Sequence, residues 1–359
     1  MNFGHHVIVT AILINTFQYG IGELITLGLA GAAMAGAGGW YWGAIKDNTY
    51  CRLTECCNTQ HVPYDIDKLK SSLDQRMFGQ PLVNELVNIL QAHKEAVNSN
   101  DSGNKKALVI SLHGWPGVGK NFAAGMIADA IYKKGMNSKY VRLYMGKNHM
   151  PNPRIKPGIC DPKAKCPKSL IIFDEIHDMC PSFCQHIPPS YFILVSYQHI
   201  YFVSRNSVFV FVSNIGGQEI ADKLLELYEA GANRNEVEFH DFEPIIRRTA
   251  YVQGGFKKAA AIANHLIDHY IPFLPLENKH VEMCAAAGFR DNELSSLKIF
   301  ICTIYYINTF FYREALSVIT YGPNEDKPIF ANNGCKRFTK QIPYVVQKYK
   351  QKSLNIGGN

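Results

Sequence analysis

The sequence lacks any run of basic residues with interleaved aromatic residues, which is the pattern typical of a nucleic-acid-binding surface. Charged residues are few, at 19% of the 359 residues, and the net charge of +7 is spread along the chain. An internal repeat is also missing, so nothing indicates a repeat architecture. We therefore expect no nucleic acid among the partners. Hydrophobic residues make up 47% of the chain, which predicts folded domains rather than a disordered protein.

The N-terminal region has no lysine or arginine before its first apolar run, Val7–Ile14, but that run has the length of a signal-peptide core. Leu24–Ile45 carries no formal charge, is rich in Gly and Ala, and has aromatic residues near its end. Its length would allow a membrane span, whereas its low hydrophobicity favours shallow insertion. The sequence predicts a signal peptide at residues 1–22 and an apolar membrane-associating region at residues 23–48. A signal anchor without a helix partner is the alternative.

The cysteine content is typical of a protein in an oxidising compartment. Asn100 begins an N-glycosylation sequon, Asn-Asp-Ser, in a polar segment. Together with the apolar N-terminus, these features predict a lumenal protein glycosylated at Asn100. The ten cysteines are Cys51, Cys56, Cys57, Cys160, Cys166, Cys180, Cys184, Cys284, Cys302 and Cys335.

A zinc site is the alternative use of four of these cysteines. Their spacings, C-x5-C and C-x3-C, are irregular compared with structural zinc sites. We therefore do not expect zinc at Cys160, Cys166, Cys180 and Cys184.

The order of elements predicts a parallel sheet flanked by helices. Apolar runs without alternation are typical of strands buried on both faces, and here they alternate with helical patterns. We expect a large α/β domain at residues 49–245 and a small, mainly helical domain at residues 246–359. The predicted strands are Ala107–Leu112, Tyr140–Tyr144, Leu170–Phe173 and Val208–Val212, and the predicted helical segments are Ile66–Ala96 and Asn121–Lys134.

A phosphate-binding loop joins the first predicted strand to the following helix, with the pattern G-x-x-x-x-G-K. Its glycines let backbone N–H groups approach phosphate oxygens, and the helix N-terminus adds positive partial charge. Lys120 is expected to reach the β- and γ-phosphates. The predicted nucleotide-binding residues of this loop are Gly114, Gly117, Val118, Gly119, Lys120, Asn121 and Phe122.

Two acidic residues, Asp174 and Glu175, end the third predicted strand in a Walker B arrangement. Asp174 is expected to hold Mg²⁺, and Glu175 to polarise the attacking water. Asn121 stands where a Ser or Thr usually binds Mg²⁺, and its amide oxygen could coordinate the ion instead. Asn214, at the end of the fourth strand, is the candidate that senses the γ-phosphate; a turn-forming Asn is the alternative.

These motifs resemble the torsin family, which consists of Clp-type AAA+ ATPases of the endoplasmic reticulum (ER) and nuclear envelope. The Asn after the phosphate-loop Lys is itself torsin-like, as is an apolar N-terminus followed by a Cys-rich connector. The resemblance implies an AAA+ P-loop NTPase fold with a small C-terminal helical lid domain. The segments that carry it are Cys51–Cys57, Phe78–Gln80, His113–Phe122, Ile172–Glu175, Ser213–Asn214, Ile271–Glu277 and Gly334–Lys336.

Further site residues are implied by the resemblance. Gly79 and Gln80 fall where Clp-type proteins contact the adenine end of the nucleotide. Lys336 matches the second sensor and would face the phosphates. Cys335 matches a torsin cysteine that pairs with one at the position of Cys284, and this disulfide would make nucleotide binding redox-sensitive. Similarly, Cys166 matches a torsin cysteine whose partner lies in the N-terminal cluster.

The resemblance also implies how the protein works: it would bind ATP or ADP with Mg²⁺ and remodel protein or membrane structures in the ER lumen and nuclear envelope. Torsins lack an arginine finger, so a membrane-bound activator would supply one, and homo- or hetero-oligomers are expected. Two alternatives are a weakly hydrolysing nucleotide-dependent scaffold and a P-loop small-molecule kinase. The N-terminal anchor and the C-terminal helical region argue against the kinase.

Three segments depart from the family pattern. Residues 149–168 are Pro-rich and short, residues 180–203 contain Pro188-Pro189 where a helix is expected, and residues 299–312 are an uncharged Ile/Tyr/Phe-rich run. They represent either divergence of this chain or retained intron sequence.

Overall fold

The computed structural model describes residues 51–99, 107–146, 166, 168–178, 206–253, 267–291, 316–317, 319–324, 327–337, 340–344 and 347. The chain divides into two compact units, residues 1–61 and 62–359. The predicted signal peptide, the apolar region 23–48 and Asn100 lie outside the described residues, as does most of the three divergent segments. Within the described ranges, no helix combines the length and apolarity needed to cross a bilayer.

The first unit contributes a short helix, α4 (Cys51–Leu53), to the described part of the chain. A disulfide between Cys51 and Cys56 closes this segment. Both cysteines are buried. The Cys-rich connector is therefore a locally crosslinked element.

The second unit is built on a five-stranded sheet in the order β2-β3-β4-β1-β5, with all neighbouring strands parallel. All seven residues of β1 and all six of β4 are buried, which explains why these strands are apolar without alternation. The four predicted strands and the parallel sheet are confirmed. The strands are β1 (Leu108–Gly114), β2 (Val141–Met145), β3 (Leu170–Asp174), β4 (Val208–Ser213) and β5 (His269–Phe273).

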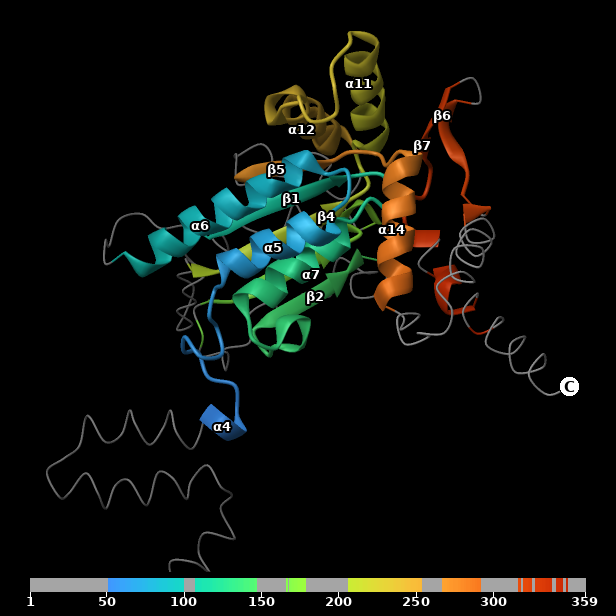
Figure 1. The fold of residues 1–359 in the computed structure, drawn as a ribbon. Helices are drawn as coiled ribbons and strands as arrows, with labels where there is room; N and C mark the ends of the chain where they lie inside the picture. Colours follow the sequence, from blue (N-terminus) through green and yellow to red (C-terminus); the bar gives the residue numbers. More distant parts are fainter. Residues whose placement is uncertain are drawn as a thin grey trace, which may run out of the picture. The chain divides into compact units, whose positions relative to one another are not determined.

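Helices cover both faces of this sheet (Figure 1). On one face, Leu69 and Ile127 pack in a core with Ile110 of β1. On the other face, Ile220 and Ile246 pack with Phe211 of β4. The first face carries α5 (Ile66–Arg76), α6 (Glu85–Asn98) and α7 (Lys120–Ile131), and the second carries α11 (Gly217–Glu229) and α12 (Glu243–Val252). The short 3-10 helices are η2 (Pro81–Asn84), η3 (Gly135–Asn137), η4 (Ile176–Asp178) and η6 (Phe239–Asp241).

The described residues after 245 include strands as well as helices. They contribute β5 to the main sheet, where Pro272 pairs beside His113 of β1. A proline is tolerated there because β5 is an edge strand. They also include α14 (Asn278–Asp291) and an antiparallel pair, β6 (Tyr321–Asn324) and β7 (Lys327–Ala331). The domain boundary at 245/246 remains a prediction.

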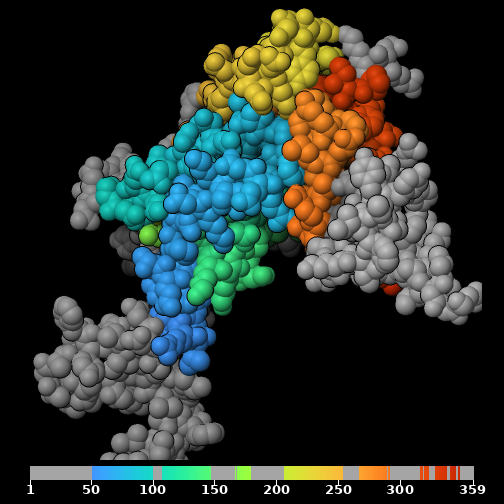
Figure 2. All heavy atoms as spheres, in the orientation of Figure 1, coloured from blue at the N-terminus to red at the C-terminus, as the bar shows by residue number. Residues whose placement is uncertain are grey.

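Helix α14, drawn in orange, lies against the blue-to-cyan surface of the first helices of this unit (Figure 2). There Arg76, the last residue of α5, forms an ion pair with Asp291, the last residue of α14. The ring of His280 leaves no room for a Cβ atom on Gly79. Helix α14 therefore packs closely on the segment that follows α5.

Candidate active site

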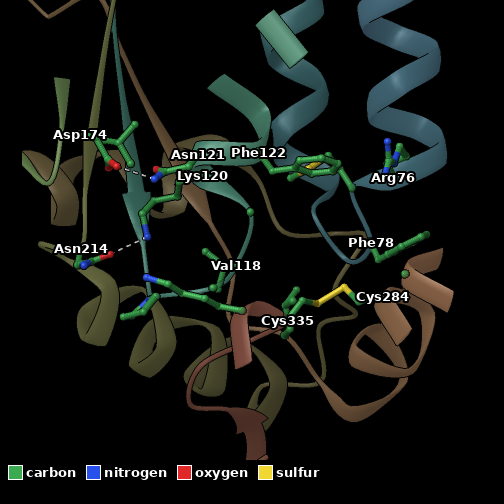
Figure 3. A pocket seen from close by; sticks show the side chains of 18 of the residues that line it. Arg76, Phe78, Val118, Lys120, Asn121, Phe122, Asp174, Asn214, Cys284 and Cys335 are labelled. Carbon is green, nitrogen blue, oxygen red and sulfur yellow. Dashed lines mark hydrogen bonds between the residues drawn. A yellow bond between two sulfur atoms is a disulfide. The ribbon is translucent and has the colours of Figure 1, made fainter. Parts of the chain in front are cut away.

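A cavity of about 420 Å³ opens between the carboxyl ends of the strands and α14. Figure 3 shows the side chains that line it. Twelve predicted site residues line this cavity: Gly117, Val118, Gly119, Lys120, Asn121, Phe122, Asp174, Glu175, Asn214, Cys284, Cys335 and Lys336. Three predicted residues, Gly114, Gly79 and Gln80, are not among its lining residues.

The phosphate loop runs from Gly114, the end of β1, to Lys120, the start of α7. Gly117 and Gly119 have φ values of 80° and 107°, in the region that favours glycine. A Cβ atom on Gly117 would lie 1.8 Å from the carbonyl oxygen of Asn333. The loop is therefore a left-handed turn that ends at a helix N-terminus, an arrangement suited to an anion such as phosphate.

Lys120 is buried, with 6% of its surface exposed. Its ammonium donates hydrogen bonds to the carbonyl oxygens of Gly114 (2.6 Å) and Trp115 (2.7 Å) and to Oδ1 of Asn214 (2.9 Å). Burial lowers the pKa of Lys120 from 10.5 to about 7; Asp174 raises this pKa and Lys336 lowers it further. The carbonyl oxygens of the phosphate loop and the Asn214 side chain thus fix the position of the Lys120 ammonium.

Asp174, at the end of β3, organises the acidic side of the cavity. Its Oδ2 accepts a hydrogen bond from Nδ2 of Asn121 (2.7 Å), and its Oδ1 accepts one from the backbone N–H of Glu175 (2.8 Å). Figure 3 shows Asn121 turned toward this carboxylate. The Asp174 carboxylate supplies oxygen donors of the kind that Mg²⁺ prefers, so it fits the ion. The Asn121 amide presents its nitrogen to Asp174 and would have to turn over for its oxygen to join that set.

Glu175 has a backbone conformation that is rare for a residue with a side chain. Its φ is 54°, in the left-handed region. The chain turns there from β3 into η4, and the residue lines the cavity. Strained backbone of this kind is found at functional sites, where surrounding structure holds it in place.

His177 is a cavity residue that the sequence analysis did not single out. Its Nδ1 accepts a hydrogen bond from the Asn214 backbone N–H (3.5 Å), and its Nε2 lies 3.2 Å from Nδ2 of Asn214. Burial lowers its pKa. No sequence motif marks this position, because its contact to Asn214 spans 37 residues.

Gly79 and Gln80 support the cavity from outside. The buried Gln80 side chain donates to the carbonyl oxygens of Val118 (3.2 Å) and Leu274 (2.8 Å), and its Oε1 accepts from the Leu274 N–H (2.8 Å). It therefore ties the phosphate loop to the end of β5. The neighbouring residues Arg76, Met77 and Phe78 line the cavity instead.

A buried arginine, Arg234, holds the Gly79 turn in place. It donates hydrogen bonds to the carbonyl oxygens of Gly79 (2.7 Å) and Pro275 (2.8 Å) and pairs with Glu277 (3.1 Å). The Tyr228 hydroxyl also donates to Glu277 (2.8 Å). This network joins the loop after α11 to the segment between β5 and α14.

A disulfide joins Cys284 of α14 to Cys335 in the turn after β7. The backbone N–H of Cys335 donates to the carbonyl oxygen of Gly117 (3.1 Å). Lys336 follows and lines the cavity. Cys166 is also disulfide-bonded, and the other three cysteines considered for zinc lie outside the described residues.

The far end of the cavity is covered by Arg76, which the sequence analysis also missed. Its guanidinium lies 5.0 Å from the centre of the Phe122 ring and pairs with Asp291. In Figure 3, Arg76 lies at the opposite end of the cavity from Asp174. The cavity thus has an acidic, lysine-containing end and an aromatic end.

Comparison with known sequences identifies close relatives. The Torsin family profile matches residues 51–173. A torsin-like protein of Drosophila melanogaster is 36% identical over 338 residues, which cover 90% of this chain and 92% of that protein. A torsin-like protein of Caenorhabditis elegans is 32% identical and covers 89% of this chain. Torsin-3A of Homo sapiens is 30% identical and covers 83% of this chain and 74% of its own length.

Comparison with solved structures shows the same fold in Hsp104. A closed-state reconstruction of Hsp104 with ATPγS and FITC casein superposes with a TM-score of 0.54 over 85% of this chain, at 12% identity. The Saccharomyces cerevisiae Hsp104–ADP complex gives a TM-score of 0.52 at 11% identity. This chain spans about half of each Hsp104 chain, at 51%. At this identity the likeness shows the AAA+ fold alone.

Proposed function

The chain belongs to the torsin family of AAA+ ATPases, and from that membership and the cavity we propose that it binds ATP or ADP with Mg²⁺ and hydrolyses ATP. The observation that carries this proposal is the meeting of Lys120, Asp174 and Asn214 at one end of one cavity. These residues come from α7, β3 and the end of β4, so only the folded sheet brings them together.

The phosphates would bind where the Lys120 ammonium now donates to Gly114, Trp115 and Asn214. Phosphoryl transfer depends mainly on positioning and on neutralising charge, and Lys120 supplies one charge. Asp174 and Asn121 would hold Mg²⁺, which neutralises charge on the β- and γ-phosphates. Lys336 adds a second cation from the turn that packs on Gly117.

Water activation is assigned to Glu175, whose side chain belongs to the cavity. It would orient the attacking water and take its proton. Asn214 would contact the γ-phosphate. Both residues stand at the carboxyl end of the sheet, where parallel α/β folds bind their ligands.

An arginine from a partner is part of this proposal. Arg76 is the only arginine among the described residues that line the cavity. Its guanidinium lies over the Phe122 ring and pairs with Asp291, at the end of the cavity away from Asp174. It is therefore poorly placed to reach a γ-phosphate beside Asp174. A membrane-bound activator would supply this group, as the family resemblance implies, within a homo- or hetero-oligomer.

The proposed location is the ER lumen and nuclear envelope, with peripheral membrane association. The disulfides Cys51–Cys56 and Cys284–Cys335 support an oxidising compartment. The signal peptide at residues 1–22, the apolar region 23–48 and glycosylation at Asn100 complete this proposal. There the ATPase would remodel protein or membrane structures.

A scaffold that binds nucleotide and hydrolyses it slowly is the second candidate. The observation that favours it is Asn121, whose amide donates to Asp174 where other P-loop proteins present a hydroxyl to Mg²⁺. Weaker binding of the ion would slow hydrolysis more than nucleotide binding.

An ATPase assay separates the two candidates. Phosphate release is measured with and without the lumenal domain of an activator, with Glu175→Gln as the inactive reference. Release that rises with the activator and vanishes in the variant supports the ATPase. Nucleotide binding with release no higher than in Glu175→Gln, at every activator concentration, would support the scaffold. No binding of ATP or ADP in a calorimeter with Mg²⁺ present would refute both.

A further inference from the structure

Asn214 stands just beyond the hydrogen-bonded part of the sheet. The pairing of β1 with β4 ends at His113 and Ser213, so the strand ladder does not hold Asn214 itself. Its side chain nevertheless accepts a hydrogen bond from Lys120 at 2.9 Å, drawn as a dashed line in Figure 3. Contacts beyond the ladder must therefore fix the position of Asn214 relative to the phosphate loop.

The side chain of His113 supplies one of these contacts. His113 is fully buried and directly precedes Gly114, where the phosphate loop begins. Its Nδ1 lies 2.9 Å from the carbonyl oxygen of Ile215, the residue after Asn214. A carbonyl oxygen can only accept, so Nδ1 carries the proton and donates it to this hydrogen bond. His113 thus ties the start of the phosphate loop to the residue that follows Asn214.

The second ring nitrogen of His113 agrees with this assignment. Its Nε2 lies 2.8 Å from the hydroxyl of the buried Ser111, which can donate to it. Burial lowers the pKa of His113 from 6.5 to about 4; Lys120 and His177 lower it further, and the hydrogen bond to Ile215 raises it. The imidazole is therefore neutral at neutral pH, with Nδ1 as its donor and Nε2 as its acceptor.

Gly217, the first residue of α11, packs against the phosphate loop from the same turn. A Cβ atom on Gly217 would lie 2.9 Å from the carbonyl carbon of Gly114 and 2.8 Å from Cδ1 of Trp115. The backbone N–H of Gly217 donates to the carbonyl oxygen of Asn214 (3.2 Å). The turn 214–217 is thus held against the phosphate loop by backbone packing and by the hydrogen bond from His113.

We propose that His113 is a positioning residue that holds Asn214 at the distance from the phosphate loop at which it contacts the γ-phosphate. This inference rests on the proposed nucleotide binding and adds a residue to it. ADP has no γ-phosphate and needs only the phosphate loop. Loss of the His113 hydrogen bond should therefore weaken the binding and hydrolysis of ATP and leave the binding of ADP unchanged. A residue that only supported the phosphate loop would affect both nucleotides equally.

The test removes the donor at Nδ1 in two ways. His113→Phe keeps a ring of similar shape, and His113→Leu replaces it with a smaller apolar side chain. The dissociation constants of ADP and of a non-hydrolysable ATP analogue are measured by calorimetry with saturating Mg²⁺, and kcat by phosphate release. We expect the preference for the triphosphate to fall about ten-fold, the value of one hydrogen bond to a charged group, and kcat to fall with it.

Three further variants isolate the contact. His113→Asn places an amide N–H near the position of Nδ1, so it should restore the preference for the triphosphate. Ser111→Ala removes the contact to Nε2 alone and should leave the preference unchanged. Asn214→Ala loses the contact to the γ-phosphate, so adding His113→Phe to it should reduce the preference no further.

The outcomes separate this inference from the function on which it rests. An unmodified protein that binds neither nucleotide overturns the proposed function. Where both nucleotides bind, an unchanged preference in His113→Phe overturns the role of His113 alone, as does an equal loss of ADP and ATP affinity. A further loss when His113→Phe is added to Asn214→Ala has the same meaning. If neither apolar variant folds while His113→Asn does, His113 acts in folding and the inference is also overturned.

Discussion

The backbone N–H of Cys335 donates a hydrogen bond to the carbonyl oxygen of Gly117, at 3.1 Å, so a disulfide-bonded residue is attached directly to the phosphate loop. The turn before Cys335 and the phosphate loop also pack closely against each other. A Cβ atom on Gly334 would lie 2.4 Å from the Gly117 oxygen. Any movement of this turn must therefore move the phosphate loop or break the contact.

Reduction of Cys284–Cys335 is expected to change the ratio of ADP to ATP affinity. The disulfide holds the turn at Cys335, and the positions of Lys336 and of the contact to Gly117 both depend on that turn. The bond closes a loop with a sequence separation of 51, so its loss should also lower the free energy of unfolding by about 4 kcal/mol. Fluorescent nucleotide titration and chemical denaturation of the Cys284→Ser/Cys335→Ser protein measure the two effects.

A matched control for this prediction is Cys51→Ser/Cys56→Ser. That disulfide has a sequence separation of 5 and lies in the other unit. It should leave the ratio of nucleotide affinities unchanged. Peptide mapping that finds Cys284 and Cys335 as free thiols under oxidising conditions would remove the basis for the prediction.

Lys120→Ala is expected to abolish nucleotide binding. The variant removes the buried charge that would face the β- and γ-phosphates, and a charged hydrogen bond of this kind contributes about 1.5–3 kcal/mol, with the loop geometry lost as well. Calorimetric titration with ATP and Mg²⁺ provides the measurement. Affinity equal to that of the unmodified protein would mean that the phosphate loop is misassigned.

Glu175→Gln should bind ATP normally and hydrolyse it about 10²- to 10⁴-fold more slowly, since the amide cannot take a proton from water. Phosphate release in the presence of activator measures the effect. Glu85→Gln, on the exposed start of α6, is the control and should hydrolyse ATP at the normal rate. Equal losses in both variants would argue against a role for Glu175 in chemistry.

At pH values above about 7, the protein should take up a proton when it binds nucleotide. Without nucleotide, burial lowers the pKa of Lys120 to about 7, so the ammonium loses its proton as the pH rises through that value. Bound phosphates favour the charged form and raise the pKa again. Calorimetry at pH 8 in buffers of different ionisation enthalpy should show proton uptake, and uptake should decrease toward pH 6. Binding at pH 8 without proton uptake would contradict the lowered pKa.

Arg234→Ala is expected to lower the free energy of unfolding by about 1–3 kcal/mol, because it removes the donor to the carbonyl oxygens of Gly79 and Pro275. Glu277 keeps its ion pair with Lys279. The exposed pair of Lys223 and Glu226 provides a matched control, and Lys223→Ala should cost less than about 1 kcal/mol. Urea denaturation of both variants gives the comparison. Similar small losses in the two would show that the Arg234 network contributes little to stability.

The sheet could be predicted where burial leaves a mark in the local sequence. Strands such as β1 and β4 are buried on both faces and are therefore apolar along their length. In contrast, β5 contains Pro272 and lies between α12 and α14 in the sequence. Its pairing with β1 depends on residues far away in the chain, so periodicity could not reveal it.

The same distinction between local sequence signals and distant contacts applies to the candidate site. The phosphate loop and the acidic pair were predictable because each motif occupies consecutive residues. The pairing of Arg76 with Asp291 joins residues 215 positions apart, and the contact of His177 with Asn214 spans 37. Contacts between residues this far apart in the sequence can be seen only in the folded structure.

The position of β5 also has a consequence for synthesis of the protein. This strand is the last of the sheet to leave the ribosome, yet it pairs with β1, the first to do so. Until Phe273 has emerged, one edge of Leu108–Gly114 remains unpaired and open to other nascent chains. A truncated polypeptide that stops at residue 245 would keep that exposed edge permanently, so recombinant versions of the nucleotide-binding sheet should extend beyond Phe273.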